Sequence, residues 1–429
     1  MKKKYRIILY TSIFLLCVVA SIILVVKKSN SVYEEESKPK VVKHKSMLSM
    51  NLEQTAGSGD YKTVTQSSWP TEGYKFNAEL SKCENGSTLS WDDTKKAVIV
   101  SGNLSDKCYV YFDIYQPTLA EYIKSQYTGT QGENNIYYHD SDLANGAGDN
   151  SYRYAGANPN NFVCFGTIES PCPIDNLYRI IGVFGENYHG ANGKQLVKLI
   201  KYDYMTTDEL GTDGDYSQTY KEWGMDSTYK GTYGDGERIG VYYWNYKATG
   251  SATNTWSTSL LNKTNLNTNF INNIGTTWAN KIATVTWKVG GNTWANIGTK
   301  TSSVAYTNEI TNPVTTNTTD NATTYSAKIG LMYVSDYGFA ASPDAWTLTM
   351  SSYNNTTATN NNWMYMGLYE WTISRNAGYS YSAFIVGRGG YVNLDSVDCH
   401  NGVRASFNLE SSVSYVSGSG SMSDPIVIN

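Results

Sequence analysis

The chain carries one long apolar run at its start and only short apolar runs after it. Residues 7–26 are mostly apolar and have basic residues on both sides. About 20 apolar residues span a bilayer as a helix, and basic residues before such a helix favour a cytoplasmic N-terminus. We predict that residues 1–28 are a cytoplasmic basic segment and a transmembrane anchor. A cleaved signal peptide is the alternative, although no A-x-A pattern follows the run.

Residues 29–68 show no apolar periodicity. They combine an acidic cluster, a basic cluster and a stretch rich in Ser, Gly and Thr. Such compositions stay disordered because they bury too little apolar surface to offset the entropy of folding. We predict a disordered stalk.

Residues 69–116 read as a small all-β module. The runs YKFNAEL, STLSWDD, KAVIVSG and KCYVYFDIY alternate apolar and polar residues, with turn-forming pairs between them. This alternation is typical of half-buried strands. Residues 117–149 are predicted to be a linker with one short helix over Pro117–Tyr127, because proline is favoured in the first turn of a helix.

Residues 150–429 form the main predicted domain, an α+β domain rich in antiparallel strands and long loops. YRYAGANPNNFVCFG, NLYRIIGVFG and KQLVKLIKYDYM read as strands, and AKIGLMYVSDYGFA reads as a buried strand. The spacing of Leu266, Phe270 and Ile274 predicts a helix over Trp256–Ile274. The Asn- and Thr-rich stretches 301–325 and 351–362 are predicted to be loops.

Charge and composition narrow the classes of partner. Removing the six basic residues of the predicted anchor leaves 28 basic against 38 acidic residues, a formal charge of −10. This balance argues against nucleic acid, whose binding depends on neutralising phosphates. The 36 Tyr and 11 Trp, together with Asn, Ser and Gly, suit a recognition surface. Half-exposed strands also favour Tyr and Thr, so both interpretations stay open.

The cysteines fit an exported protein. Five of the six lie beyond the predicted anchor, and disulfides persist outside the cell. We predict the pairs Cys83–Cys108 and Cys164–Cys172, because each closes a short local loop. Cys399 is left over and is expected to be free or to pair with another molecule.

Motifs of catalysis and of metal or phosphate binding are incomplete. The glycines at 387–390 lack a Walker lysine, and no His pair has zinc-ligand spacing. Asp336, Asp344 and Glu370 are scattered acids that show no sign of a catalytic pair. Residues 211–216 and 233–238 resemble fragments of calcium loops without completing the EF-hand pattern. We therefore expect plain turns there, with calcium as the alternative, and no other cofactor.

Residues 363–404 are dense in aromatic and charged side chains, which suits a binding rim. Trp371, Arg375 and Arg404 are expected to be structural, and the Gly- and Ser-rich context favours exposure of several others. The residues predicted to bind a ligand are Trp363, Tyr365, Tyr369, Tyr379, Tyr381, Arg388, Tyr391, Asp395 and His400.

The order of LYRIIGVFG, LVKLIKYDY, EWTISRNAG and GVRASFNL resembles a large set of uncharacterised surface domains of gut-dwelling Gram-positive bacteria. It is also distantly similar to the formylglycine-generating-enzyme branch of the C-type-lectin-like fold. The resemblance implies a C-type-lectin-like fold over 150–429, closed by strands at Trp371–Arg375 and Gly402–Arg404. Those enzymes hold copper with two cysteines in the C-terminal part of the domain. Only Cys399 is present here, so their activity is not carried over.

The sequence thus favours a single-pass cell-surface protein that binds a glycan or a protein through its aromatic loops. The alternatives are an enzyme acting on cell-wall or glycan substrates, a structural surface protein without a ligand, and a diversified receptor-binding domain of phage or retroelement type. Fold resemblance alone does not choose among them.

Overall fold

The computed structural model describes residues 48–65, 68–70, 73–103, 105–185, 189, 193–224, 227–314, 322–354 and 360–429. The chain divides into two compact units, Met1–Gln116 and Pro117–Asn429. The predicted anchor, residues 1–28, lies outside the described residues. Within those described ranges, no helix combines the length and the apolar character needed to cross a bilayer.

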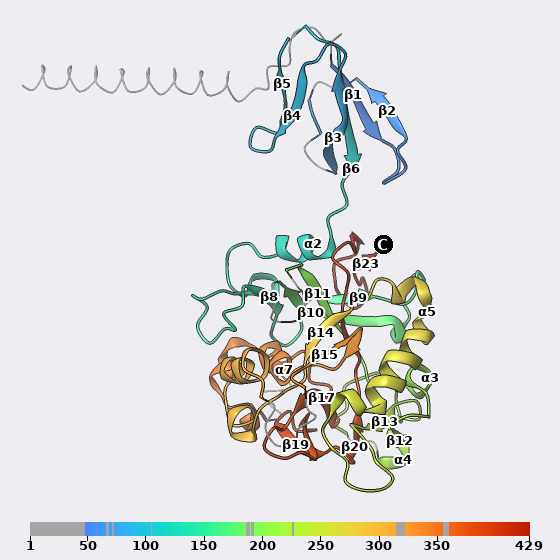
Figure 1. Cartoon of the computed structure of the whole chain (residues 1–429), viewed down its shortest axis with the longest axis vertical. Helices are drawn as coiled ribbons and strands as arrows, with labels where there is room; N and C mark the ends of the chain where they lie inside the picture. Colours follow the sequence, from blue (N-terminus) through green and yellow to red (C-terminus); the bar gives the residue numbers. More distant parts are fainter. Residues whose placement is uncertain are drawn as a thin grey trace, which may run out of the picture. The chain divides into compact units, whose positions relative to one another are not determined.

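The first unit is built of strands (Figure 1). One sheet has the order β2-β1-β6-β3, and β4 and β5 form a separate hairpin. Rings of Phe76, Trp91 and Phe112 pack together in its core. The strands are β1 (Leu48–Glu53), β2 (Tyr61–Val64), β3 (Tyr74–Cys83), β4 (Thr88–Asp92), β5 (Ala97–Ser101) and β6 (Cys108–Ile114). The four runs predicted as strands are therefore confirmed as β3 to β6.

The predicted stalk is wrong over its second half. Strand β1 lies in the middle of the sheet, where it pairs in parallel with β6 and antiparallel with β2. Met50 and Leu52 are buried in the core. The pairing of Leu48 with Cys108 joins residues far apart in sequence, so local composition gave no sign of it. Residues 29–47 lie outside the described residues.

Both predicted disulfides are confirmed. Cys83 and Cys108 lie opposite each other on β3 and β6, and the other bridge joins Cys164 to Cys172. Cys399 forms no disulfide with any other described residue and is half-buried.

In the described part of the second unit, the strands form two larger sheets and two short strand pairs (Figure 1). The first sheet has the order β16-β21-β11-β10-β8-β7, with β9 also paired to β10, and the second has the order β12-β13-β20-β17-β18-β19. The first sheet consists of β7 (Ile136–His139), β8 (Ser151–Tyr154), β9 (Phe162–Cys164), β10 (Leu177–Phe184), β11 (Leu196–Lys201), β16 (Ile329–Gly330) and β21 (Ser406–Asn408). The second consists of β12 (Tyr216–Thr219), β13 (Gly240–Tyr243), β17 (Glu370–Arg375), β18 (Ser382–Val386), β19 (Val392–Ser396) and β20 (His400–Gly402). The short pairs are β14 (Val285–Lys288) with β15 (Thr324–Ala327), and β22 (Tyr415–Ser417) with β23 (Val427–Ile428).

Short helices connect these strands. The α- and π-helical segments are α2 (Leu119–Ser125), α3 (Thr207–Leu210), α4 (Tyr220–Trp223), η4 (Leu261–Phe270), α5 (Ile271–Ala279), α6 (Ser302–Tyr306), η6 (Thr307–Thr311) and α7 (Val334–Ala340). The 3₁₀ segments are η1 (Glu133–Asn135), η2 (Ile174–Asn176), η3 (Trp256–Thr258), η5 (Trp294–Asn296), η7 (Pro343–Thr347) and η8 (Met350–Ser352). The mixed architecture agrees with the predicted α+β class.

One core connects the two sheets and the helix η4. It holds Ile180 and Leu199 from the first sheet, Trp371 from the second, and Leu266 and Phe270 from η4. The helix predicted over Trp256–Ile274 is therefore helical over most of its length, and it buries the expected face.

Three predictions for this unit are corrected. Residues 117–149 contain the expected helix, α2, but they also supply β7 to the first sheet, so they belong to the domain and are not a linker. The predicted loop 301–325 contains α6 and η6, because Ala305 and Tyr306 are buried in the cores. The predicted buried strand AKIGLMYVSDYGFA ends after Gly330 and continues as helix α7. All seven residues of α7 are buried, and a run buried on every side has no periodicity to separate helix from strand.

Candidate ligand-binding site

A surface pocket lies where α4 meets the second sheet. Its cavity is about 160 Å³. We call it the Trp223 pocket, and its lining residues are Tyr220, Trp223, Gly224, Leu368, Tyr369 and Arg388. Elements α4, β12 and β20 lie at the lower end of the second unit in Figure 1, whereas α2 and the C-terminus lie at its upper end. The pocket is thus at the far end of this unit from the point where the chain enters it.

Local sequence places Trp223 at the end of a short, well-capped helix. The Thr219 side chain accepts a hydrogen bond from the backbone of Glu222, whose own side chain bonds back to Thr219. This reciprocal capping box fixes the start of α4. Gly224 ends the helix with a φ of 110°, a conformation open to glycine. The indole is held at the surface with 37% of Trp223 exposed.

Aromatic contacts hold the pocket in shape. The Tyr220 hydroxyl donates a hydrogen bond to the Tyr369 carbonyl oxygen at 2.7 Å. The ring of Trp223 lies 5.0 Å from that of Tyr220 and 5.9 Å from that of Tyr369. Burial and a side-chain hydrogen bond with Tyr369 raise the pKa of Tyr391. The rings therefore form a platform whose members fix one another.

Arg388 supplies the positive charge of the pocket. It is exposed in the turn between β18 and β19, and its guanidinium lies 5.9 Å from the centre of the Tyr369 ring. The hydroxyl of buried Tyr365 donates a hydrogen bond to the Arg388 carbonyl oxygen, which holds the turn in place. The pocket combines flat apolar rings with one cation, a combination that suits a polar ligand with an apolar face.

Four of the predicted ligand-binding residues gather here. Tyr369 and Arg388 line the pocket, and Tyr391 bonds to Tyr369. The His400 ring lies 5.0 Å from Trp223. Burial lowers the pKa of His400 against the opposing charge of Asp395, so the imidazole is neutral at pH 7.

The other predicted ligand-binding residues lie elsewhere. Tyr379 and Tyr381 are 57% and 53% exposed and form a ring pair of their own, 5.8 Å apart, outside the pocket lining. Asp395 is half-buried and accepts hydrogen bonds from Asn401 and from the backbone of Ser396.

The predictions for Trp363 and Tyr365 are corrected. Each is only 3% exposed. The Trp363 indole donates to the Tyr154 carbonyl oxygen at 2.9 Å, and the guanidinium of Arg179 lies 4.6 Å from its ring. Both residues are core, because the segment crosses the interior before it reaches the surface at Tyr369.

The residues expected to be structural are all buried. The Trp371 indole donates to the Tyr242 carbonyl oxygen at 2.7 Å. Arg375 donates to two backbone carbonyls in the loops around Val289 and Val314. Arg404 forms a two-point ion pair with Glu370, at 2.8 and 2.9 Å.

Sequence reasoning missed Trp223 and Tyr220. They lie about 150 residues before Tyr369, since the Tyr220–Tyr369 hydrogen bond has a separation of 149. The available signal was the capping box at Thr219 and Glu222, followed at once by an aromatic residue and a glycine.

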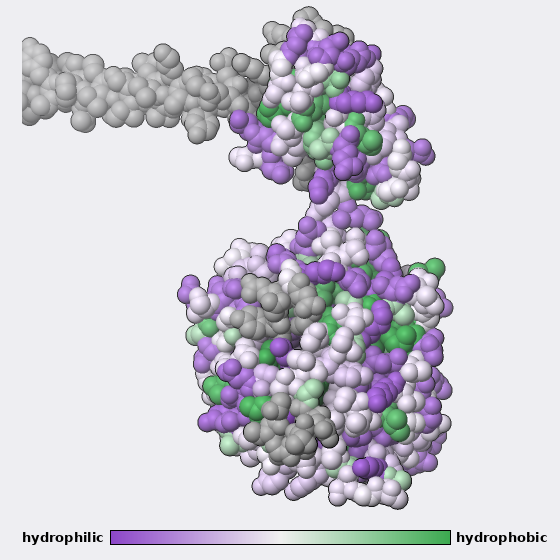
Figure 2. Space-filling view, viewed as in Figure 1, coloured by the Kyte–Doolittle hydropathy of each residue, from purple (hydrophilic) through white to green (hydrophobic). Residues whose placement is uncertain are grey.

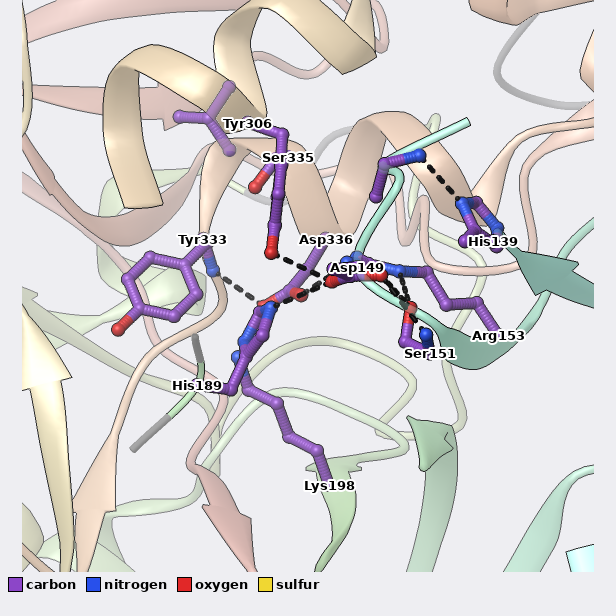
Figure 3. Close-up of polar contacts among 12 residues, drawn as sticks. His139, Asp149, Ser151, Arg153, His189, Lys198, Tyr306, Tyr333, Ser335 and Asp336 are labelled. Atoms are coloured by element: carbon purple, nitrogen blue, oxygen red, sulfur yellow. Dashed lines mark hydrogen bonds and ion pairs between the residues drawn. The ribbon is translucent and has the colours of Figure 1, made fainter. Parts of the chain in front are cut away.

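A second concentration of polar chemistry lies inside the unit. We call Asp149, Arg153, His189, Lys198 and Asp336 the buried charged cluster (Figure 3). Arg153 pairs with Asp149 at 2.7 Å and Lys198 pairs with Asp336 at 2.5 Å, with all four side chains at most 3% exposed. These residues come from β8 and the loop before it, from the segment between β10 and β11, from β11 and from α7.

The charges in the buried charged cluster compensate one another. Burial alone would raise the pKa values of Asp149 and Asp336, but the neighbouring cations Arg153 and Lys198 outweigh it and lower both. Burial, with those same cations, lowers the pKa of His189 to about 3. Two carboxylates thus face two cations beside a neutral histidine.

The chemistry of the buried charged cluster is that of a structural network. Its side chains are nearly fully buried, and its two carboxylates are paired with Arg153 and Lys198. Of the three acids considered as catalytic candidates, Asp336 is tied to Lys198 and Glu370 is tied to Arg404. Within the described ranges, no three His, Cys, Asp or Glu side chains gather in a way that could hold a metal ion.

In the two segments that resemble calcium loops, the aspartates have hydrogen-bond or ion-pair partners within the protein. Asp213 accepts a hydrogen bond from Asn269 at 2.7 Å. Asp215 is buried and accepts from the backbones of Tyr246 and Leu261. Asp235 lies on the surface beside Lys221.

Comparisons of this chain with protein-family models, curated proteins and solved structures found no match.

Proposed function

We propose that the second unit binds a glycan at the Trp223 pocket, as the recognition domain of a membrane-anchored cell-surface protein. The observation that carries the proposal is an open pocket lined by the exposed ring of Trp223, the partly exposed ring of Tyr369, the buried Tyr220 and Leu368, and one exposed arginine. A pyranose presents a face of C–H groups that packs on an aromatic ring, and hydroxyl groups that take hydrogen bonds at its edge. Aromatic walls with a few polar groups supply both kinds of contact.

The size of the cavity supports a small ligand. At about 160 Å³ it is smaller than the roughly 300–1,000 Å³ of pockets for drug-sized molecules and cofactors. A site of this size suits one sugar ring and leaves the neighbours of that ring in solvent.

The lining favours binding over hydrolysis. Glycoside hydrolysis needs two carboxyl groups on either side of the scissile bond. The described residues that line the pocket are tyrosines, a tryptophan, a leucine, a glycine and an arginine, without a carboxylate.

Placement at the cell surface rests on the cysteines and on the start of the sequence. Two disulfides favour an oxidising compartment, and residues 7–26 are long and apolar enough for an anchor. The −10 charge beyond that run makes nucleic acid a poor partner.

The face of the second unit in Figure 2 also suits recognition of polar ligands. Hydrophobic residues there are scattered among polar ones. Large obligate protein interfaces instead have a continuous apolar centre.

A glycan array tests the proposal. The full chain in detergent is applied beside its Trp223→Ala and Tyr379→Ala variants. We expect the parent and Tyr379→Ala to bind the same glycans and Trp223→Ala to lose that binding while keeping the parent's circular dichroism. Absence of binding by the parent, or equal binding by all three proteins, would overturn the proposal and turn attention to a protein partner.

A further inference from the structure

We infer that the Trp223 pocket is one end of a longer aromatic track that binds a linear oligosaccharide. The track consists of Tyr246, Tyr243, His400, Trp223 and Tyr369. This inference rests on the proposed glycan function and adds the ligand's form: a chain of β-1,4-linked pyranoses with equatorial substituents. Rings of that type are flat on both faces.

The track is continuous from ring to ring. The Tyr246 and Tyr243 rings are stacked with centres 4.5 Å apart. Tyr243 is 6.0 Å from His400, His400 is 5.0 Å from Trp223, and Trp223 is 5.9 Å from Tyr369. Tyr246 is 47% exposed at one end and Trp223 is 37% exposed, and Tyr243, His400 and Tyr369 are partly exposed.

Ring orientations divide the track into two platforms. Tyr243 and Tyr246 are inclined by 25° to each other, and Trp223 and Tyr369 by 37°. The His400 ring stands at 75° to Trp223 and 79° to Tyr243. The imidazole therefore stands nearly perpendicular to the ring on either side of it and separates the two platforms.

The platforms are fixed by the sheet beneath them. Tyr243 on β13 lies opposite His400 on β20 in the ladder register. Strand β12, which leads into α4 and Trp223, pairs with the other edge of β13. The backbone of Tyr246 donates to the buried carboxylate of Asp215 at 3.1 Å. Sites on rigid strands lose little entropy on binding.

Polar groups lie beside the rings. The Gln218 amide lies 3.4 Å from the Nε2 atom of His400, and the Ser217 hydroxyl donates to the Tyr243 hydroxyl at 3.3 Å. Both residues lie on β12, at the edge of the second sheet. They place hydrogen-bonding groups beside Tyr243 and His400, in the middle of the track.

The test is a length series measured by isothermal titration calorimetry on the full chain. The probes are glucose and N-acetylglucosamine, each with its β-1,4-linked oligomers from two to six units. We expect affinity to rise with length until both platforms are covered and then to level off. Binding energy from a second linked contact adds to that of the first.

Two variants separate the platforms. Tyr246→Ala is expected to weaken the longest oligomers by roughly tenfold, the scale of a single interface anchor, and to leave the shortest unchanged. Trp223→Ala is expected to weaken every length. Tyr381→Ala, outside the track, serves as the matched control and is expected to bind like the parent.

The outcomes distinguish this inference from the proposed function. Binding that depends on Trp223 but not on length or on Tyr246 would overturn the track and leave the pocket as a single-sugar site. A glycan-array signal for other glycans, with no binding of either series, would also overturn the track. No glycan binding by any assay would overturn both.

Discussion

The buried charged cluster and the aromatic track use their residues in opposite ways. The cluster gathers carboxylates, cations and histidine, the side chains that usually mark catalysis, and places them in the interior. The track gathers rings, the side chains that usually fill a core, and leaves them at the surface. Residue type alone therefore misleads in both regions, and exposure decides which of them can meet a ligand.

The two regions should also differ in what their mutations change: the free energy of unfolding in one and ligand affinity in the other. Charges taken out of water are costly unless each keeps its partner, so the buried charged cluster should dominate the response of stability to mutation. Half-exposed rings contribute little to folding, and those of the track should dominate the response of binding. The predictions that follow run from the largest expected effect to the smallest.

Breaking one ion pair of the buried charged cluster should have the largest effect. Asp336→Ala leaves Lys198 buried without its partner and is expected to cost about 3–5 kcal/mol of unfolding free energy. Urea unfolding at pH 7 measures the loss. Asp235→Ala, at the surface beside Lys221, is the control and should change stability by less than about 0.5 kcal/mol. A stable Asp336→Ala protein that no longer binds glycans would contradict the assignment of the cluster to structure.

The second-largest effect should be the pH dependence of the unfolding free energy. Glu309 is fully buried and accepts hydrogen bonds from the backbones of Val334 and Ser335 and from the Ser374 hydroxyl. Burial raises its pKa from 4.5 to about 7. The folded protein therefore holds this proton more tightly than the unfolded chain does. The stability from this group is full below pH 4.5 and is lost as pH rises through about 7.

Comparing Glu309→Gln with the parent isolates this contribution. Urea unfolding between pH 5 and pH 8 should show the parent losing up to about 3 kcal/mol relative to the variant, which has no proton to lose at this position. Parallel pH profiles for the two proteins would show that Glu309 does not titrate in this range.

Removing the Trp223 ring should affect binding more than folding. Trp223→Ala is expected to reduce glycan affinity by about 2 kcal/mol, roughly 30-fold, since it removes the platform of the pocket. Because Trp223 is 37% exposed, unfolding should change by about 1 kcal/mol or less. Calorimetry and urea unfolding measured on the same preparation check both numbers. A large loss of stability without loss of affinity would reverse the roles given to the two regions.

The exposed pair Tyr379 and Tyr381 should give the smallest effect. Neither lines the pocket or the track, so replacing either by alanine is expected to change glycan affinity and unfolding by less than about 0.5 kcal/mol. The same two assays check this. Loss of affinity in Tyr381→Ala would move the binding site to their loop.

The parts of the fold that the sequence predicts correctly are those whose signals lie within a few neighbouring residues. The strands from Tyr74 to Ile114 and the helix at Leu119 were recognisable because their apolar spacing, turns and caps lie within a few residues. The two disulfides were predictable because each bridges a short loop.

Long-range pairing explains what sequence did not show. Strand β1 was missed because its pairing partner β6 lies far along the chain, with Asn51 and Val110 separated by 59 residues. The pair Lys198 and Asp336 spans 138 residues, and no local pattern shows that these two charges meet. The pocket joins α4 to a loop that follows it by about 150 residues, so the dense stretch 363–404 revealed one wall only.

The most direct test of the account is a crystal structure of the chain soaked with cellohexaose and, separately, with chitohexaose. The account predicts electron density for a sugar ring stacked on Trp223 beside Tyr369 and Arg388, extending past His400 toward Tyr246. Density over the Tyr379 and Tyr381 pair, or density for neither sugar anywhere on the second unit, would contradict it.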